Sequence, residues 1–257
     1  MQNQPERGKG LTELSLAAAC GKLPGMVDLE TLRSRLTDEA PLTWVITGDS
    51  ITHGLRHTDG SRAYADHLHE IVRGDLARYR DALVNTAISG SRITDILGDF
   101  DRRVADWSPQ IVTLMIGTND CAVTDGAPRV EPVEFGHAVG DFVSRVRSLG
   151  AVPVLQTPPP VDAANAQTRS RIGDFAQAVR DVAQAQAQGT ILVDHFAQFL
   201  SLGGEDLPWA LLGDPFHPGA LGHAALTVEL ARVLGFENAP TVHRLRTAVE
   251  ARGYVFA

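Results

Sequence analysis

Short apolar runs alternate with amphipathic stretches along most of this chain. Five runs are short and apolar enough to be buried strands, and they cover residues 42–47, 83–87, 111–116, 152–156 and 191–193. Between and after them, apolar residues recur at helical spacing, which predicts helices over residues 64–79, 93–107, 132–149, 166–188 and 219–234. This alternation of strands and helices predicts an α/β fold, a parallel sheet with helices on both faces.

The two ends of the chain stand apart from this pattern. We expect residues 1–40 to form a helical leader, with helices over 11–19 and 29–36. Residues 41–240 then form one domain, and residues 241–257 form a tail whose short helix, over 243–252, packs on the outside. A chain of 257 residues is long enough for one such domain with a sizeable core.

The composition is that of a soluble globular protein, with 44% hydrophobic and 21% charged residues. A net charge of −8 does not favour a nucleic-acid-binding surface. No apolar run approaches the roughly 20 residues that span a bilayer, and residues 1–10 carry no apolar core of a signal peptide. We therefore expect a cytoplasmic protein that has no membrane span and acts on a small molecule, and the sequence leaves its oligomeric state open.

Lysine and cysteine are scarce. Only Lys9 and Lys22 are present, so the body of the fold has no lysine for a phosphate-binding loop or a Schiff base. Cys20 and Cys121 are more typical of free thiols than of a disulfide in an intracellular chain. Cys121 lies near a candidate site, but a small buried hydrophobic residue is the favoured interpretation.

Four short blocks carry the candidate chemistry. They are residues 48–50 (Gly-Asp-Ser), 85–90 (Asn-Thr-Ala-Ile-Ser-Gly), 117–120 (Gly-Thr-Asn-Asp) and 214–218 (Asp-Pro-Phe-His-Pro). The first three follow predicted strands, and ligands bind at the carboxyl ends of the strands in open parallel sheets. The fourth lies in the loop before the last long helix.

The residue types in these blocks match a serine hydrolase. Ser50 is the candidate nucleophile, His217 the candidate base, and Asp214 the acid that orients the base from the same loop. The amides of Ser50 and Gly90 and the side chain of Asn119 are candidate donors to an oxyanion. Taken singly, Ser50 equally suits a helix cap and the other blocks suit turns, but together the blocks favour catalysis.

With these motifs the chain resembles the SGNH, or GDSL-type, hydrolases. Its first block reads Gly-Asp-Ser-Ile over residues 48–51, where the family has Gly-Asp-Ser-Leu, and the blocks at 117–120 and 214–218 are intact. The resemblance spans about residues 42–235. It implies a flavodoxin-like three-layer αβα sandwich whose central parallel sheet has about five strands. It also implies a Ser-His-Asp mechanism on esters that needs no cofactor.

Other functions stay open beside ester hydrolysis. Acyl transfer to an alcohol other than water and hydrolysis of lipids or thioesters are compatible with the same residues, as is a non-catalytic binding module. An α/β-hydrolase elbow is disfavoured because position 52 is Thr rather than Gly, and the blocks do not form a dinucleotide fingerprint.

Histidines outside the fourth block give little support for a metal site. His67 and His69 are two residues apart on a predicted helix, so they face different ways. His53 and His57 follow Ser50 by three and seven residues and could face the site, but helix-surface or loop positions are the more typical interpretation.

The expected substrate is a short acyl ester such as an acetyl ester. The loops expected to line the pocket, residues 53–60, 158–166 and 203–215, contain few large aliphatic residues, chiefly Leu55, Val161 and Leu207. A long acyl chain would need more apolar lining.

Overall fold

The computed structural model describes residues 26–256 except 125–126, 129, 186–188 and 204–210. The strands are β1 (Thr43–Gly48), β2 (Ala82–Asn85), β3 (Ile111–Met115), β4 (Val123–Thr124), β5 (Ala127–Pro128), β6 (Val152–Gln156) and β7 (Ile191–Val193). The α-helices are α1 (Met26–Thr37), α2 (Ser50–His53), α3 (Tyr64–Glu70), α4 (Ile93–Gly98), α5 (Phe100–Arg103), α6 (Pro132–Ser148), α7 (Ile172–Ala185), α8 (His195–Gly203), α9 (Ala220–Leu234) and α10 (Pro240–Glu250). A π-helical turn, η1 (Ile71–Asp75), and two 3₁₀ turns, η2 (Ala105–Trp107) and η3 (Gln167–Arg169), complete the elements.

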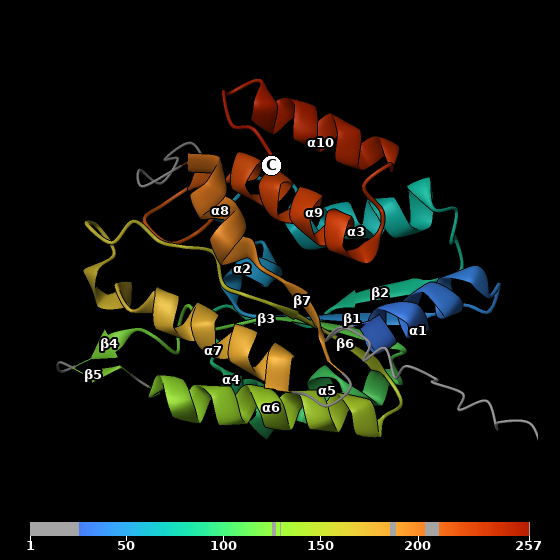
Figure 1. The fold of residues 1–257 in the computed structure, drawn as a ribbon, viewed down its shortest axis with the longest axis horizontal. Coiled ribbons are helices and arrows are strands. Elements are labelled where there is room, and N and C mark those ends of the chain that lie inside the picture. Colours follow the sequence, from blue (N-terminus) through green and yellow to red (C-terminus); the bar gives the residue numbers. More distant parts are fainter. Residues whose placement is uncertain (1–25, 125–126, 129, 186–188, 204–210, 257) are drawn as a thin grey trace, which may run out of the picture.

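Five strands form one parallel sheet in the order β2-β1-β3-β6-β7. Counted along the chain, this is the 2-1-3-4-5 order of flavodoxin-like sheets. Helices cover both faces, with α3 and α9 on one side of the strands and α6 on the other (Figure 1). The predicted three-layer sandwich with a parallel sheet of five strands is therefore confirmed. The short strands β4 and β5 form a separate antiparallel pair.

Each central strand sends alternate side chains into two cores, as the pleat requires. From β1, Trp44 and Ile46 enter the core beneath α1, α3, α8, α9 and α10, and Val45 enters the core beneath α4 to α7. From β3, Met115 and Leu114 divide in the same way. Because both faces are buried, the strands appear in the sequence as continuous apolar runs.

Several predicted helices differ from the observed ones. The helix expected over 93–107 is broken into α4, α5 and η2, because Asp99 and Val104 adopt non-helical backbone angles. This break turns Arg103 inward, where it is only 2% exposed. The helix expected from 166 begins at Ile172, because the amides of Asn165 and Ala166 turn back to the carbonyl of Asp162. Its predicted end, at 188, lies outside the described residues.

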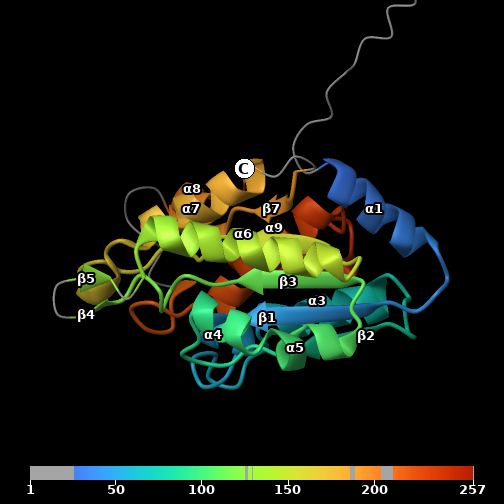
Figure 2. The same ribbon diagram turned by 90° about the horizontal axis from the view of Figure 1, so that it is seen from below.

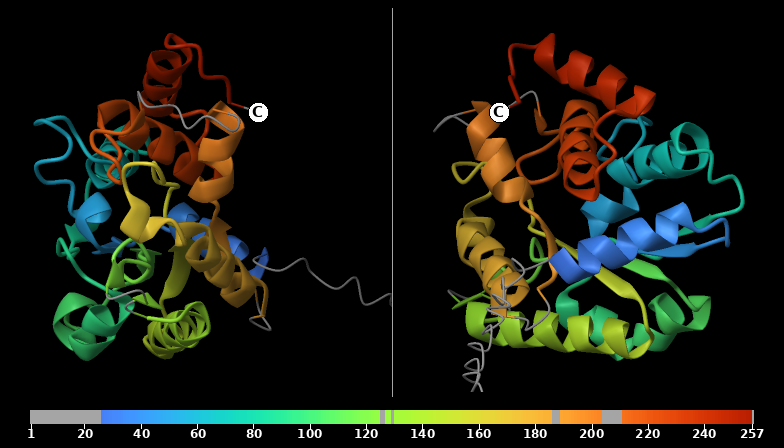
Figure 3. Two further views of the ribbon diagram at one scale, coloured as in Figure 1. Left: turned by 90° about the vertical axis from the view of Figure 1, so that its left-hand side faces the viewer. Right: turned by 45° about the vertical axis from the view of Figure 1, so that its right-hand side comes forward.

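The flanking helices pack on the domain. Helix α1 includes all of the residues 29–36 for which a helix was predicted. The helix predicted over 11–19 lies outside the described residues. Helix α10 begins three residues earlier than expected and packs on α9, where Val242 and Val249 join the core (Figure 3). The division into leader, domain and tail stays a prediction. Within the described ranges, no helix has the length and apolar character needed to cross a membrane.

Candidate active site

The candidate site lies where β1 and β3 end side by side. The chain passes from β1 outward to β2 and then crosses back to β3 on the other side of β1, and ligands bind at such a switch point. Strands β1 and β3 lie side by side (Figure 2), and Gly48 pairs with Met115 at the last position of the two strands. Ser50 therefore begins α2 directly beyond β1, and Asn119 follows β3 four residues on.

The turn into α2 depends on two residues before the serine. A Cβ on Gly48 would collide with the carbonyl oxygen of Met115 and with Oγ1 of Thr52, so only glycine fits at this end of β1. Asp49 caps the helix, because its Oδ1 accepts the amide of Ile51 at 3.0 Å. The serine thus starts a short helix from a fixed backbone position.

A chain of hydrogen bonds joins Ser50 to the loop before α9. Ser50 Oγ lies 2.8 Å from His217 Nε2, and His217 Nδ1 lies 2.7 Å from Asp214 Oδ2. A carboxylate only accepts hydrogen bonds, so His217 carries its proton on Nδ1 and offers the Nε2 lone pair to the serine hydroxyl. The structure thus brings together the three residues that the sequence suggested as nucleophile, base and acid.

The surroundings of His217 and Asp214 determine the charge of each side chain. Burial lowers the pKa of His217, and His57 and Arg169 lower it further. Together these effects outweigh Asp214, which raises the pKa. Burial raises the pKa of Asp214, but the amides of Phe216 and His217 and the imidazole of His217 outweigh it, so the net shift is downward. At neutral pH the arrangement is therefore a neutral imidazole beside a carboxylate.

The two further oxyanion candidates are joined through Ser91. The amide of Ser91 bonds the carbonyl of Ile88, which closes a turn that contains Gly90 at a φ of +85°. Asn119 Nδ2 donates to the carbonyl of Ser91 at 3.1 Å. One hydrogen of the Asn119 amide is thereby fixed, and the other is left for a second acceptor.

Two arginines that the sequence analysis did not single out connect the blocks. Arg103 donates to the carbonyl of Gly48 and to Ser91 Oγ, each at 3.1 Å, and so connects the first block to the oxyanion turn. Arg169 donates to the carbonyl of Thr118 at 3.1 Å and stacks on the ring of Phe216, 3.8 Å from its centroid. Neither contact leaves a local sequence pattern, since each joins segments that are distant in the chain.

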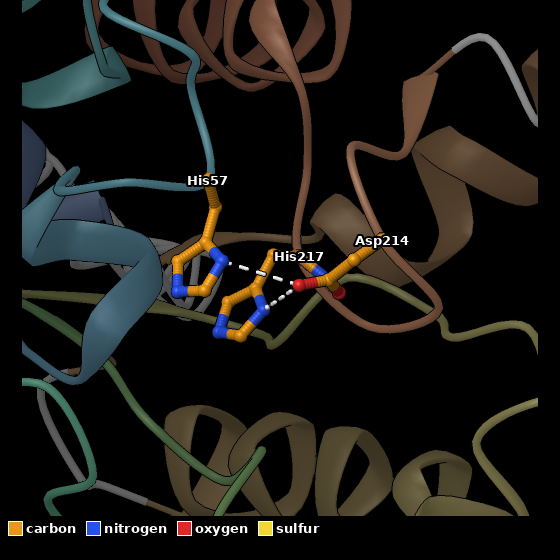
Figure 4. Close-up of side chains that lie close together, drawn as sticks. All are labelled: His57, Asp214 and His217. Carbon is orange, nitrogen blue, oxygen red and sulfur yellow. Dashed lines mark hydrogen bonds and ion pairs between the residues drawn. The ribbon is translucent and has the colours of Figure 1, made fainter.

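The sequence analysis left open whether His53 and His57 face the candidate site. The structure brings the ring of His57 against His217 (Figure 4). His53 instead hydrogen-bonds with Ser89 Oγ at 3.1 Å. His57 lies in a loop, which the sequence analysis favoured, and it also faces the site, which that analysis left open. His57, Asp214 and His217 are the one group in the described residues with three side chains close enough to surround a metal ion.

Two buried carboxyl groups lie behind the site. Asp120 accepts the amide of Ile93 at 2.9 Å, and burial raises its pKa to about 7, with the charge of Asp49 adding to the rise. Burial also raises the pKa of Asp49 to about 7. Cys121, next to Asp120, is a buried free thiol whose pKa burial raises to about 12, as expected of a small buried hydrophobic residue.

We expect Asp120→Asn to stabilise the protein increasingly as the pH rises. The unfolded chain releases this proton near pH 3.8, whereas the folded chain keeps it until about pH 7, so folded parent protein loses stability between these values. Asparagine keeps the acceptor for Ile93 and has no proton to lose. Urea denaturation should show the free energy of unfolding of the variant gaining about 1–3 kcal/mol on the parent between pH 4.5 and 8.

The control for this prediction is Asp106→Asn, which changes an exposed carboxylate. Its stability should follow the parent at every pH. A constant difference between the Asp120→Asn protein and the parent from pH 4.5 to 8 would contradict the prediction.

Comparison with known proteins gives several relatives. The chain is 26% identical over 161 residues to the acetylxylan esterase of Geobacillus stearothermophilus, covering 60% of this chain and 73% of the relative. It is 31% identical over 122 residues to the uncharacterized lipoprotein YqeF of Bacillus subtilis, covering 46% of this chain. The chain spans only 48% of YqeF and 10% of a third relative, an uncharacterized protein of Mycoplasma pneumoniae.

Solved structures share the fold. A mutant of Axe2, an acetyl-xylooligosaccharide esterase from the same Geobacillus source, superposes with a TM-score of 0.66 at 22% identity. LAE5, an alpha/beta hydrolase enzyme from the metagenome of Lake Arreo, superposes with a TM-score of 0.65 at 26% identity. Each match covers 78% of this chain and 98% of the other.

A family model matches residues 46–225, which include all four sequence blocks. This match confirms the predicted relationship and, with it, the predicted enzyme class, an SGNH-type esterase. The chain belongs to the GDSL-like lipase/acylhydrolase family.

Proposed function

We propose that this protein hydrolyses short carboxylic esters through a covalent acyl-serine intermediate. The observation that carries the proposal is the unbroken hydrogen-bond chain from Ser50 Oγ through His217 to Asp214. A serine hydroxyl is a weak nucleophile unless an adjacent base takes its proton, and this chain supplies the base with its orienting acid.

In the first step, Ser50 Oγ bonds to the ester carbonyl carbon while its proton moves to His217 Nε2. The carbonyl oxygen becomes an oxyanion, for which the amides of Ser50 and Gly90 and the free hydrogen of Asn119 Nδ2 are the donors. The carbon–oxygen bond to the alcohol then breaks, and the alcohol takes the proton from His217. Asp214 keeps its hydrogen bond to Nδ1 throughout and stabilises the transient imidazolium.

In the second step, water repeats the same chemistry. His217 takes a proton from water as the water oxygen bonds to the acyl carbon, and the bond to Ser50 Oγ breaks as the serine regains a proton. The acid leaves and the enzyme is restored. If another alcohol replaced water here, the reaction would be acyl transfer, which product analysis with an added alcohol distinguishes.

We further propose that acetyl esters of carbohydrates are the substrate class. The support is twofold: one relative is named an acetylxylan esterase, and the sequences of the loops expected to line the pocket contain few large aliphatic residues. Of the aliphatic residues expected to line the pocket, Leu55 is 54% exposed but Val161 is only 4% exposed and belongs to the core. Leu207 lies outside the described residues. A long acyl chain would therefore find few apolar contacts.

Ser50→Ala should lower kcat for p-nitrophenyl acetate by about 10³-fold or more, because no second nucleophile is positioned by His217. A fluorophosphonate probe should add its mass to the parent protein at Ser50 and leave the variant unlabelled. Ser144→Ala, which removes a serine on the outer helix α6, should keep parental turnover and labelling. Parental turnover by the Ser50→Ala protein would refute the mechanism.

Asn119→Ala should lower kcat by about 10²–10³-fold with little change in KM, because its donor acts chiefly on the oxyanion of the transition state. Steady-state kinetics with p-nitrophenyl acetate measures both constants. A rise in KM at constant kcat would instead make Asn119 a residue that binds the substrate before reaction.

The kcat/KM should fall from acetyl to dodecanoyl p-nitrophenyl esters, because the rim gives a long chain too few apolar contacts. Acetylated xylo-oligosaccharides should also release acetate faster than triacetin at equal ester concentration. A steady rise in kcat/KM with chain length would overturn the proposed acyl preference and favour a lipid ester.

A further inference from the structure

A buried arginine lies behind the candidate oxyanion donors without an acid to neutralise it. Arg103 is only 2% exposed. Among the described residues it makes hydrogen bonds to two oxygens and no ion pair. Removing a charge from water without a counter-ion costs free energy, and hydrogen bonds to neutral oxygens return only part of it. Packing alone therefore does not account for an arginine at this position.

The acids whose charges act on Arg103 are paired with other arginines. Asp95 pairs with Arg92, and Asp99 pairs with Arg102. Burial lowers the pKa of Arg103, and this effect outweighs the charges of Asp99 and Asp95, which raise it. Because a guanidinium stays protonated in proteins, Arg103 is nevertheless a buried cation. Its Nε has no hydrogen-bond acceptor within the described part of the chain.

The hydrogen bonds of Arg103 join two backbone segments of the site. One Nη atom donates to the carbonyl of Gly48 at the end of β1, and the other donates to Ser91 Oγ in the turn over residues 88–91, each at 3.1 Å. The amide of Ile88 also donates to the Gly48 carbonyl, but over a longer distance of 3.3 Å. Arg103 thus adds a charged donor, which makes the stronger kind of hydrogen bond, to a weaker backbone contact.

Ser91 carries this link to the remaining donors. Its amide closes the turn that contains Gly90, its Oγ accepts from Arg103, and its carbonyl accepts from Asn119 Nδ2 at 3.1 Å. Ser50 lies two residues after the other acceptor of Arg103. All three candidate oxyanion donors are therefore within two residues, or one hydrogen bond, of an atom that Arg103 holds. Such donors stabilise an oxyanion best when they are fixed in place before its charge develops.

We propose that Arg103 is a positioning residue of the active site, which holds the turn over residues 88–91 against the end of β1 and so sets the spacing of the oxyanion donors. This inference rests on the proposed function, because it concerns the donors of that reaction. Arg103 acts through Gly48 and Ser91 rather than on the substrate, since its guanidinium is buried and bonds oxygens of the protein itself.

Three variants and a matched control test this role. Arg103→Met keeps the length of the side chain and removes its charge and its donors. Ser91→Ala removes one acceptor of Arg103 and leaves the Ser91 carbonyl in place, and the double variant removes both ends of that hydrogen bond. The control is Arg102→Met, which changes the adjacent arginine, whose side chain is 67% exposed. For each protein, kcat and KM for p-nitrophenyl acetate and the Tm are measured.

Arg103→Met should lose about tenfold or more in kcat with KM within about twofold of the parent, because the donors act chiefly on the transition state. Its Tm should stay within about 4 °C of the parent, because the lost hydrogen bonds are offset by no longer burying a charge. An arginine that only stabilised the fold would give the opposite pattern, a lower Tm with parental kcat. The control should match the parent in all three quantities.

Ser91→Ala should lose about threefold in kcat at an unchanged KM, because Arg103 then holds only the Gly48 carbonyl. The double variant should lose no more kcat than Arg103→Met alone, since the same hydrogen bond cannot be removed twice. Parental kcat in Arg103→Met or in Ser91→Ala, or losses that multiply in the double variant, would overturn the proposal. If Arg103→Met did not fold, Ser91→Ala alone would decide by the same criterion.

The parent and Ser50→Ala separate a failure of this inference from a failure of the proposed function. A parent without turnover, or with turnover that survives in Ser50→Ala, would contradict the proposed function and the inference that rests on it. A parent whose turnover depends on Ser50, together with an unimpaired Arg103→Met protein, would contradict the inference alone.

Discussion

The parallel pairing of β1 with β3 determines where the chemistry lies. Their register ends with Gly48 opposite Met115, and each strand then passes into a tight turn. One turn presents Ser50 and the other presents Asn119, so the proposed nucleophile and a proposed oxyanion donor come from neighbouring strand ends although they are distant in the sequence. The requirement for glycine at position 48 follows from the same closeness, because the β3 carbonyl occupies the space that a side chain would need.

The spacing of apolar residues along the chain predicted most of the strands and the longest helix. Strands β1, β3, β6 and β7 were predictable because their side chains are buried on both faces of the sheet, which leaves continuous apolar runs. Helix α6 was predictable from its spacing and its initial proline. The break at Asp99 was not predictable, because no proline marks it in the sequence and a single glycine is tolerated within a helical pattern. Helix α8 was not predictable either, because it follows β7 without a loop signal.

The residues of the candidate site also differ in whether the sequence could identify them. Ser50, Gly90, Asn119, Asp214 and His217 stood out because they occur in short blocks at predicted strand ends or in one loop. His57 did not, because its approach to Asp214 depends on the path of the loop after α2. That path uses left-handed backbone conformations at Gly54, Arg56, Asp59 and Gly60, and no sequence period reveals such a path. Contacts of this kind follow from tertiary geometry rather than from composition.

The distance in sequence between the serine and its base has a consequence for the nascent chain. Ser50 and His217 are 167 positions apart, and the base arrives in the loop that leads into α9, the helix on which α10 packs. A ribosome will therefore have made Ser50, its helix cap and the segments around Gly90 and Asn119 well before His217 exists. If Ser50 is the proposed nucleophile, the growing chain lacks the base that would activate it until residue 217 has been added, so the order of synthesis keeps the shorter chains inert.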